Sequence, residues 1–146
     1  MIRLHVSPKL CSGCRSCEMA CSYAHAEVEA RVAGGLGGLR PGLPRVRVSV
    51  TGTRAFVPML CFQCDEARCI GACKYGALER SLRTGAIEVN EERCTLCGLC
   101  AAACPFGNME LEHSRPAMVK CDLCRGEPAC AKFCPTGALR GASLPR

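Results

Sequence analysis

Sixteen cysteines, arranged in four quartets, constrain this chain more than any other feature of its sequence. Every quartet opens with C-x2-C and closes with C-x3-C, while the middle spacing is two, four, two and five residues in turn. The quartets are Cys11, Cys14, Cys17 and Cys21; Cys61, Cys64, Cys69 and Cys73; Cys94, Cys97, Cys100 and Cys104; and Cys121, Cys124, Cys130 and Cys134. A repeat of this kind predicts four similar sites.

Composition indicates that these cysteines supply the structural framework. They make up 16 of 146 residues, about 11%, and at that density a framework consists of disulfides or of metal. The chain has no Trp, two Tyr and four Phe, so it is short of the large side chains that fill an ordinary core. We therefore expect something other than side chains to occupy part of the interior.

The redox compartment helps to decide between disulfides and metal. Residues Met1–Pro8 contain no basic segment followed by an apolar run and no twin-arginine pair, so we expect no export signal, although a partner subunit could carry one. The longest stretch without charge, Cys94–Met109, has 16 residues and is too short to span a membrane. The sequence thus predicts a cytoplasmic protein, and in the reducing cytosol such cysteine patterns usually bind metal.

The first and third quartets match the bacterial ferredoxin pattern C-x2-C-x2-C-x3-C, which ligates [4Fe-4S] clusters. Two successive C-x2-C steps surround three corners of a cubane, and the fourth cysteine of two-cluster ferredoxins ligates the neighbouring cluster. Zinc is a weaker alternative, because a tetrahedral ion does not need a third cysteine so close to a pair. Disulfides are weaker still, because adjacent triplets cannot pair locally without strain. We predict four [4Fe-4S] clusters with all sixteen cysteines as ligands.

The formal charge of +6 does not indicate a nucleic-acid partner. Four thiolates around a [4Fe-4S] core leave about −2 per cluster, so four clusters contribute roughly −8. The cluster-loaded protein is then close to neutral, and we expect its basic residues to compensate cluster charge and to contact protein partners.

Between the quartets the sequence predicts short strands and helices, an α+β class. Alternation predicts one hairpin from Arg45–Val50 and Ala55–Met59, and another from Ala77–Arg80 and Ala86–Val89. Shorter strands are expected at Ile2–Val6, Met109–Leu111, Met118–Lys120 and Ala138–Arg140, and short helices at the C-x3-C segments, such as Leu99–Cys104 and Ala129–Cys134. The Gly- and Pro-rich segment Gly34–Gly42 predicts a flexible linker without regular structure.

The order of the sixteen cysteines, with Cys11–Cys21 reading CSGCRSCEMAC and Cys94–Cys100 reading CTLCGLC, carries a family resemblance over nearly the whole chain. The chain resembles the four-cluster iron–sulfur subunits of the dimethyl sulfoxide reductase type. It is also similar to the small ferredoxin-like subunits that accompany tungsten aldehyde oxidoreductases and carbon monoxide dehydrogenases. The motif is specific for cluster content and only weakly specific for the enzyme that is served.

The resemblance implies two ferredoxin-like βαββαβ units with pseudo-twofold symmetry and a cluster-dependent core. The implied outer unit comprises residues 1–33 and 105–146, the inner unit residues 61–104, and residues 34–60 a linker and hairpin. The implied ligand sets are Cys11, Cys14, Cys17 and Cys134; Cys21, Cys121, Cys124 and Cys130; Cys61, Cys64, Cys69 and Cys104; and Cys73, Cys94, Cys97 and Cys100. Spacing alone equally allows the first quartet to pair with the second, and the third with the fourth.

The expected function is electron transfer without catalysis by the chain itself. The sequence has no nucleophile–base pair, phosphate-binding Gly loop or dinucleotide fingerprint, so we expect no catalytic residue. The resemblance implies a hetero-oligomer in which this subunit connects a tungsto- or molybdopterin catalytic subunit to another redox partner, such as a flavin subunit or other electron carrier. A free-standing polyferredoxin is the alternative, and a cluster-based sensor is a more distant one.

Three polar residues near the cysteines leave two interpretations open. His25 could hydrogen-bond a cluster sulfur or relay a proton, although a lone His is more often structural or exposed. Lys74 and Lys120 adjoin cluster cysteines and either tune the reduction potential or are merely solvated.

Overall fold

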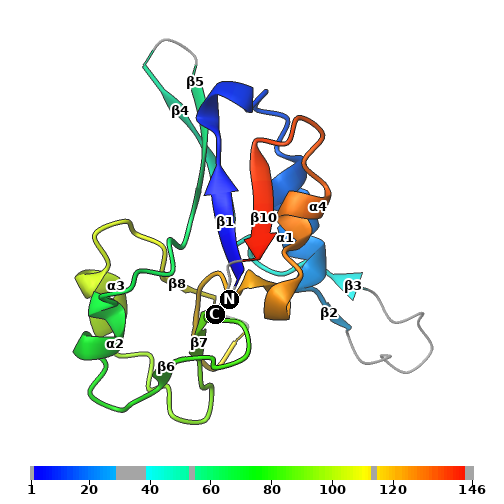
Figure 1. The fold of residues 1–146 in the computed structure, drawn as a ribbon. Helices are drawn as coiled ribbons and strands as arrows, with labels where there is room; N and C mark the ends of the chain where they lie inside the picture. Colours follow the sequence, from blue (N-terminus) through cyan, green and yellow to red (C-terminus); the bar gives the residue numbers. More distant parts are fainter. Residues whose placement is uncertain (1, 29–38, 53–54, 113–114, 144–146) are drawn as a thin grey trace, which may run out of the picture.

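A computed structural model describes residues 2–28, 39–52, 55–112 and 115–143, which form short helices and strands (Figure 1). The strands are β1 (Ile2–Val6), β2 (Glu27–Val28), β3 (Leu39–Arg40), β4 (Val46–Thr51), β5 (Ala55–Leu60), β6 (Leu78–Arg80), β7 (Ile87–Val89), β8 (Glu110–Leu111), β9 (Met118–Val119) and β10 (Leu139–Ser143). The α-helices are α1 (Ser16–Ala24), α2 (Arg68–Ala72), α3 (Leu99–Ala103) and α4 (Ala129–Lys132), and the 3-10 helices are η1 (Pro8–Leu10) and η2 (Leu123–Gly126). This mixture confirms the α+β class.

The strands form separate antiparallel pairs in the described part of the chain: β1 with β10, β2 with β3, β4 with β5, β6 with β7, and β8 with β9. In the first pair, Ile2 lies opposite Ser143 and Val6 opposite Leu139. The beginning and the end of the described chain therefore lie side by side. This pairing brings the segment before the first quartet next to the segment that follows the fourth.

Each quartet places its closing C-x3-C segment in or beside a short helix, and these helices pack in two pairs. Helix α1 packs against α4, and α2 packs against α3. Figure 1 shows the α2–α3 pair and the α1–α4 pair on opposite sides of the molecule. The fold thus groups the first quartet with the fourth and the second quartet with the third.

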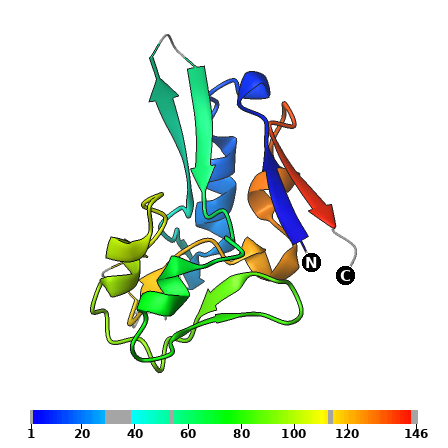
Figure 2. The ribbon, with the colours of Figure 1, turned by 60° about the vertical axis from the view of Figure 1, so that its left-hand side comes forward.

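In the hairpin of β4 and β5, β4 packs against α1 and β5 packs against η1 (Figure 2). Val46 and Val48 are buried, whereas the intervening Arg47 is exposed, as the alternating sequence predicts. The two buried valines pack in one core with Cys17 and Cys21 of α1. The hairpin thereby covers the helix that carries the last two cysteines of the first quartet.

Two groups of buried side chains form the core, and cysteines belong to both. The first group contains Cys17, Cys21, Val46, Val48, Leu60, Ala86, Cys121, Leu123, Cys130 and Leu139. The second contains Leu78, Ile87, Cys100, Met109 and Met118. Sulfur-bearing side chains therefore occupy core positions that aliphatic and aromatic residues fill in most domains.

The predicted strands and both predicted hairpins are confirmed within three residues at their ends, but the linker prediction is wrong in part. Leu39 and Arg40 form β3, which pairs with Glu27–Val28, because two residues just ahead of Pro41 are free to make backbone hydrogen bonds. Gly34–Gly38 lie outside the described residues. None of the helices in the described segments has the length and apolar character needed to cross a bilayer.

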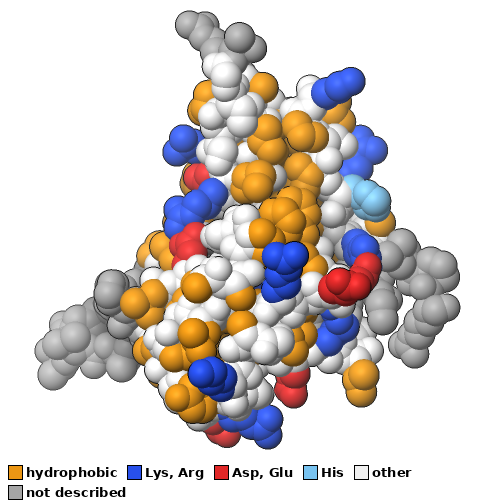
Figure 3. Space-filling model, turned by 90° about the vertical axis from the view of Figure 1, so that its left-hand side faces the viewer, with side chains coloured by type: hydrophobic (Ala, Val, Ile, Leu, Met, Phe, Trp, Pro, Cys, Tyr) orange, Lys and Arg blue, Asp and Glu red, His pale blue; other side chains and the backbone are white. Residues whose placement is uncertain are grey.

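Large hydrophobic side chains are exposed around the second and third quartets: Phe62, Tyr75, Leu96, Leu99 and Phe106. The rings of Phe62 and Phe106 contact each other, with centroids 4.6 Å apart and planes inclined by 57°. Figure 3 shows the side of the molecule on which α2 and α3 lie; hydrophobic side chains gather in its upper middle, at the height of the β4–β5 hairpin, and others are scattered over its lower part. An apolar surface of this kind is suited to contact with another protein.

Candidate iron–sulfur centres

The four C-x2-C loops share one backbone bend. The residue just before the second cysteine has a positive φ in every loop: 73° at Gly13, 51° at Gln63, 56° at Leu96 and 56° at Leu123. Non-glycine residues adopt this left-handed conformation rarely, and it persists where the surrounding structure requires it. The common bend shows that the four quartets are repeats in structure as well as in sequence.

The cysteines of the second and third quartets line two cavities in crosswise sets. A cavity of about 340 Å³ is lined by Cys61, Cys64, Cys69 and Cys104. A tighter cavity is lined by Cys73, Cys94, Cys97 and Cys100. Each combines three cysteines of one quartet with the last cysteine of the other. Four thiols around one space form the donor set of a [4Fe-4S] cluster, so the residues present fit this group.

In the outer part of the fold, Cys130 marks where the first and fourth quartets meet. Burial raises the pKa of the Cys130 thiol, and the charges of Cys121, Cys21, Cys124 and Cys17 raise it further. Cys17 and Cys21 of the first quartet are buried in one core group with Cys121 and Cys130 of the fourth. Cys134 follows α4, the helix that packs against α1, and is thereby brought to the side of the first quartet.

Backbone amides donate hydrogen bonds to four of the cysteine sulfurs. The N–H groups of Arg45, Ala77, Met118 and Leu139 donate to Cys21, Cys73, Cys94 and Cys134 at 3.2, 3.3, 3.5 and 3.5 Å, respectively. Although burial alone would raise the pKa of Cys73 and Cys134, these and neighbouring amides lower it. Amide donors thus favour the thiolate that binds iron, and hydrogen bonds to sulfur help to set cluster potentials.

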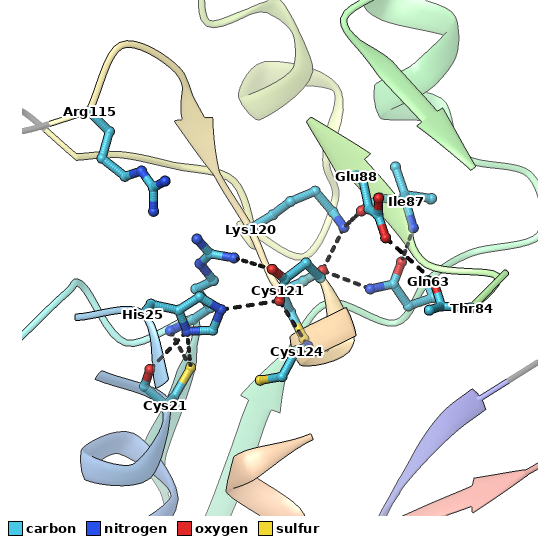
Figure 4. A network of polar contacts seen from close by, with 12 residues as sticks. Cys21, His25, Gln63, Thr84, Ile87, Glu88, Arg115, Lys120, Cys121 and Cys124 are labelled. Atoms are coloured by element: carbon cyan, nitrogen blue, oxygen red, sulfur yellow. Dashed lines mark hydrogen bonds and ion pairs between the residues drawn. The ribbon is translucent and has the colours of Figure 1, made fainter. Parts of the chain in front are cut away.

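His25 is held in a polar network beside Cys21 (Figure 4). Its Nδ1 lies 2.8 Å from the Cys21 carbonyl oxygen and 3.7 Å from Cys21 Sγ, and its Nε2 lies 3.1 Å from Asp122 Oδ1. Arg45 pairs with the other carboxylate oxygen of Asp122 at 2.9 Å. Burial opposes protonation, but Asp122 and Cys21 raise the pKa of His25 to about 9. The His25 side chain is only 10% exposed and lies within hydrogen-bonding distance of the Cys21 sulfur, so the exposed interpretation is wrong and a contact with a cysteine sulfur is present.

The two lysines differ in their surroundings. Lys74 is exposed, whereas Lys120 is 4% exposed, so the solvated interpretation is wrong for Lys120. Sequence reasoning missed Gln63, Asp122 and Arg45 altogether. The partners of Gln63 lie 24 and 58 residues away, and His25 lies 97 residues from Asp122, so no local pattern could reveal these contacts.

Comparison with known proteins identifies the family of this chain. Residues 53–143, more than half of the chain, match the family described as the 4Fe-4S dicluster domain. The chain belongs to this 4Fe-4S dicluster family. Residues 8–24 match a second family, the 4Fe-4S binding domain, so that the two matches include all four quartets.

Relatives of this dicluster protein include subunits of redox enzymes and an electron transport protein. The polyferredoxin-like subunit of aliphatic sulfonate oxidoreductase from Pyrococcus furiosus is 38% identical over 129 residues, covering 88% of this chain and 69% of the relative. Formate hydrogenlyase subunit 2 of Escherichia coli is 34% identical over 167 residues, covering 89% of this chain and 76% of the relative. The E. coli electron transport protein HydN is 35% identical over 149 residues, covering 88% and 81%. The chain is thus an iron–sulfur protein of electron transport that binds [4Fe-4S] clusters.

Proposed function

We propose that the chain holds four [4Fe-4S] clusters and conducts electrons through them within a larger oxidoreductase. The observation that carries this proposal is the crosswise gathering of cysteines around the two inner cavities. The proposed ligand sets are Cys11, Cys14, Cys17 and Cys134; Cys21, Cys121, Cys124 and Cys130; Cys61, Cys64, Cys69 and Cys104; and Cys73, Cys94, Cys97 and Cys100. All sixteen cysteines are then ligands.

The proposed division is an outer two-cluster unit of residues 1–33 and 105–146 and an inner two-cluster unit of residues 61–104. Pairing of β1 with β10 and of α1 with α4 supports the outer unit, and packing of α2 on α3 supports the inner one. Met109 and Met118 belong to the outer unit by sequence but pack with Leu78 and Ile87 in the second core group. The segment around β8 and β9 therefore joins the two units.

The proposed order of the four sites is suited to conduction. Cys61 packs against the core group that contains Cys121, which supports placing their two sites next to each other. The sites that contain Cys121 and Cys61 are then central, and the exposed Cys14 and Cys97 belong to the two end sites. Bound clusters supply one-electron chemistry, while the thiols hold them and the backbone amides adjust their potentials.

The proposed complex is a hetero-oligomer with a tungsto- or molybdopterin catalytic subunit and a second redox partner, such as a flavin subunit or another electron carrier. The resemblance to dimethyl sulfoxide reductase-type subunits and the name of the P. furiosus relative support this choice. In this assembly the chain is the non-catalytic subunit of the dimethyl sulfoxide reductase type. The exposed apolar side chains around the second and third quartets are suited to one of the two contacts.

Anaerobically purified protein is expected to contain about sixteen iron and sixteen acid-labile sulfide per chain, because four complete cysteine quartets accommodate four cubanes. Iron, sulfide and zinc would be measured on the same sample. An iron count near eight, or stoichiometric zinc, would contradict the proposal of four clusters.

Purification from the native source distinguishes the subunit from a free-standing polyferredoxin. We expect this chain to co-purify with a larger redox-active polypeptide through two chromatographic steps and to donate electrons to it or accept them from it. A chain that elutes alone at its own mass of 15.5 kDa, fully loaded with clusters, would favour the free carrier.

A further inference from the structure

Lys120 lies at the boundary between the two proposed units. Its Nζ donates hydrogen bonds to the carbonyl oxygens of Ile87, at 2.5 Å, and of Cys121, at 2.7 Å (Figure 4). Ile87 belongs to β7, between the second and third quartets, while Cys121 opens the fourth. The side chain thus reaches from the edge of one proposed cluster site into the core of the neighbouring unit.

The surroundings of Lys120 leave its charge to be balanced by the cluster sites. Among the described residues, its ammonium group makes contact with carbonyl oxygens and with no carboxylate. A buried cation is costly unless negative charge lies nearby. The side chain of Lys120 lines the same cavity as Cys61 and Cys69, and Lys120 directly precedes Cys121 in the chain. The same ammonium therefore lies beside the two central sites.

Gln63 completes a direct connection between these sites. It lies between Cys61 and Cys64, is 5% exposed, and has a left-handed backbone with φ 51°. Its Nε2 donates to the Cys121 carbonyl at 2.8 Å, and its Oε1 accepts from the Ile87 N–H at 2.8 Å. The Cys121 carbonyl thus receives one hydrogen bond from Gln63 and one from Lys120.

We propose that Lys120 and Gln63 form the electron-transfer junction between the two units, and that the buried ammonium of Lys120 makes both central clusters easier to reduce. This inference rests on the proposed function. With both central clusters bound, the fixed positive charge of Lys120 would stabilise the electron that passes from one to the other. Gln63 orients the Cys121 loop against the loop of Cys61 and Cys64, and both residues are positioning residues.

The test compares Lys120→Met with Lys120→Arg, which keeps the charge, in a redox titration followed by electron paramagnetic resonance. At a fixed potential, the ratio of reduced to oxidised central clusters is expected to fall about tenfold in Lys120→Met, a shift of about 59 mV for one electron. It should stay within about threefold of wild type in Lys120→Arg. Lys74→Met is the matched control, because it removes an exposed charge beside Cys73, where solvent screens it.

Iron counts separate this inference from the proposed function. Suppose that Lys120→Met keeps sixteen iron and that the potentials of its central clusters are unchanged, or shift by the same amount as in Lys74→Met. Either result would overturn the role of Lys120 and leave the four-cluster proposal intact. If Lys120→Met loses clusters, the titration of the wild-type protein tests the inference instead. At one potential, the ratio of reduced to oxidised clusters is then expected to be at least about tenfold higher for the central clusters than for the end clusters. The signals of the end clusters are assigned through Cys14→Ser and Cys97→Ser. End clusters that are reduced first would overturn the inference.

Discussion

Complete removal of iron is expected to unfold this chain. Helix α1 has nine residues and the other α-helices have four or five, whereas isolated helices shorter than about 12–15 residues are marginal in water. The strands of the described segments form two-stranded pairs, which are also marginal by themselves. Neither kind of element can persist without the tertiary contacts that join them.

Those tertiary contacts depend on cysteines. Cys17, Cys21, Cys121 and Cys130 belong to the first core group, and Cys100 to the second. Domains are typically stable by about 5–15 kcal/mol, while metal binding at a structural zinc site supplies about 10–16 kcal/mol. If each cluster contributes on this scale, losing all four exceeds the whole stability of the fold.

Far-UV circular dichroism of chelator-treated protein provides the measurement, and we expect loss of most of the helical and strand signal. The control is cluster-loaded protein taken through the same handling without chelator. Restoring iron and sulfide under reducing conditions should recover the signal. An iron-free chain that keeps native-like circular dichroism and unfolds cooperatively would show that side chains alone sustain the fold.

Local sequence patterns were sufficient to predict the elements that depend on short-range physics. In β4, Val46 and Val48 face the core because side chains alternate between the faces of a strand. The hairpin of β6 and β7 follows from a turn at Thr84–Gly85, where Gly85 has φ 77°. Cysteine spacing was equally informative, since it identified every thiol that lines the two inner cavities.

The remaining features depend on contacts that no local pattern contains. Gln63 and Leu123 adopt a left-handed conformation that sequence reasoning reserves for Gly, because the cysteines on either side fix the path of the loop. His25 meets Asp122 across 97 residues. The sequence left two interpretations open for Lys120, and its burial depends on contacts such as the one with Ile87, 33 residues away.

Substitution of Cys134 by Ser tests the crossed ligation that underlies the proposed electron path. Cys134 belongs to the fourth quartet, but its helix packs against α1 of the first. If it ligates the cluster of Cys11, Cys14 and Cys17, then Cys134→Ser should perturb that distant site and spare the site of Cys121, Cys124 and Cys130. Serine oxygen is a poorer iron ligand than thiolate, so the affected cluster should shift in potential or lose one iron.

Electron paramagnetic resonance of Cys134→Ser, compared with Cys11→Ser and Cys121→Ser, decides between the two pairings. We expect Cys134→Ser to resemble Cys11→Ser, because both remove one ligand of the same end cluster. Loss of a residue that hydrogen-bonds a metal ligand lowers metal affinity or activity by about 10- to 100-fold. Loss of a ligand itself should therefore slow electron delivery by at least that factor. The partner's activity with an artificial acceptor should stay unchanged, since the role proposed for this chain is conduction alone. A spectrum matching Cys121→Ser would exclude crossed ligation, and loss of the artificial-acceptor activity would mean that this chain contributes to catalysis itself.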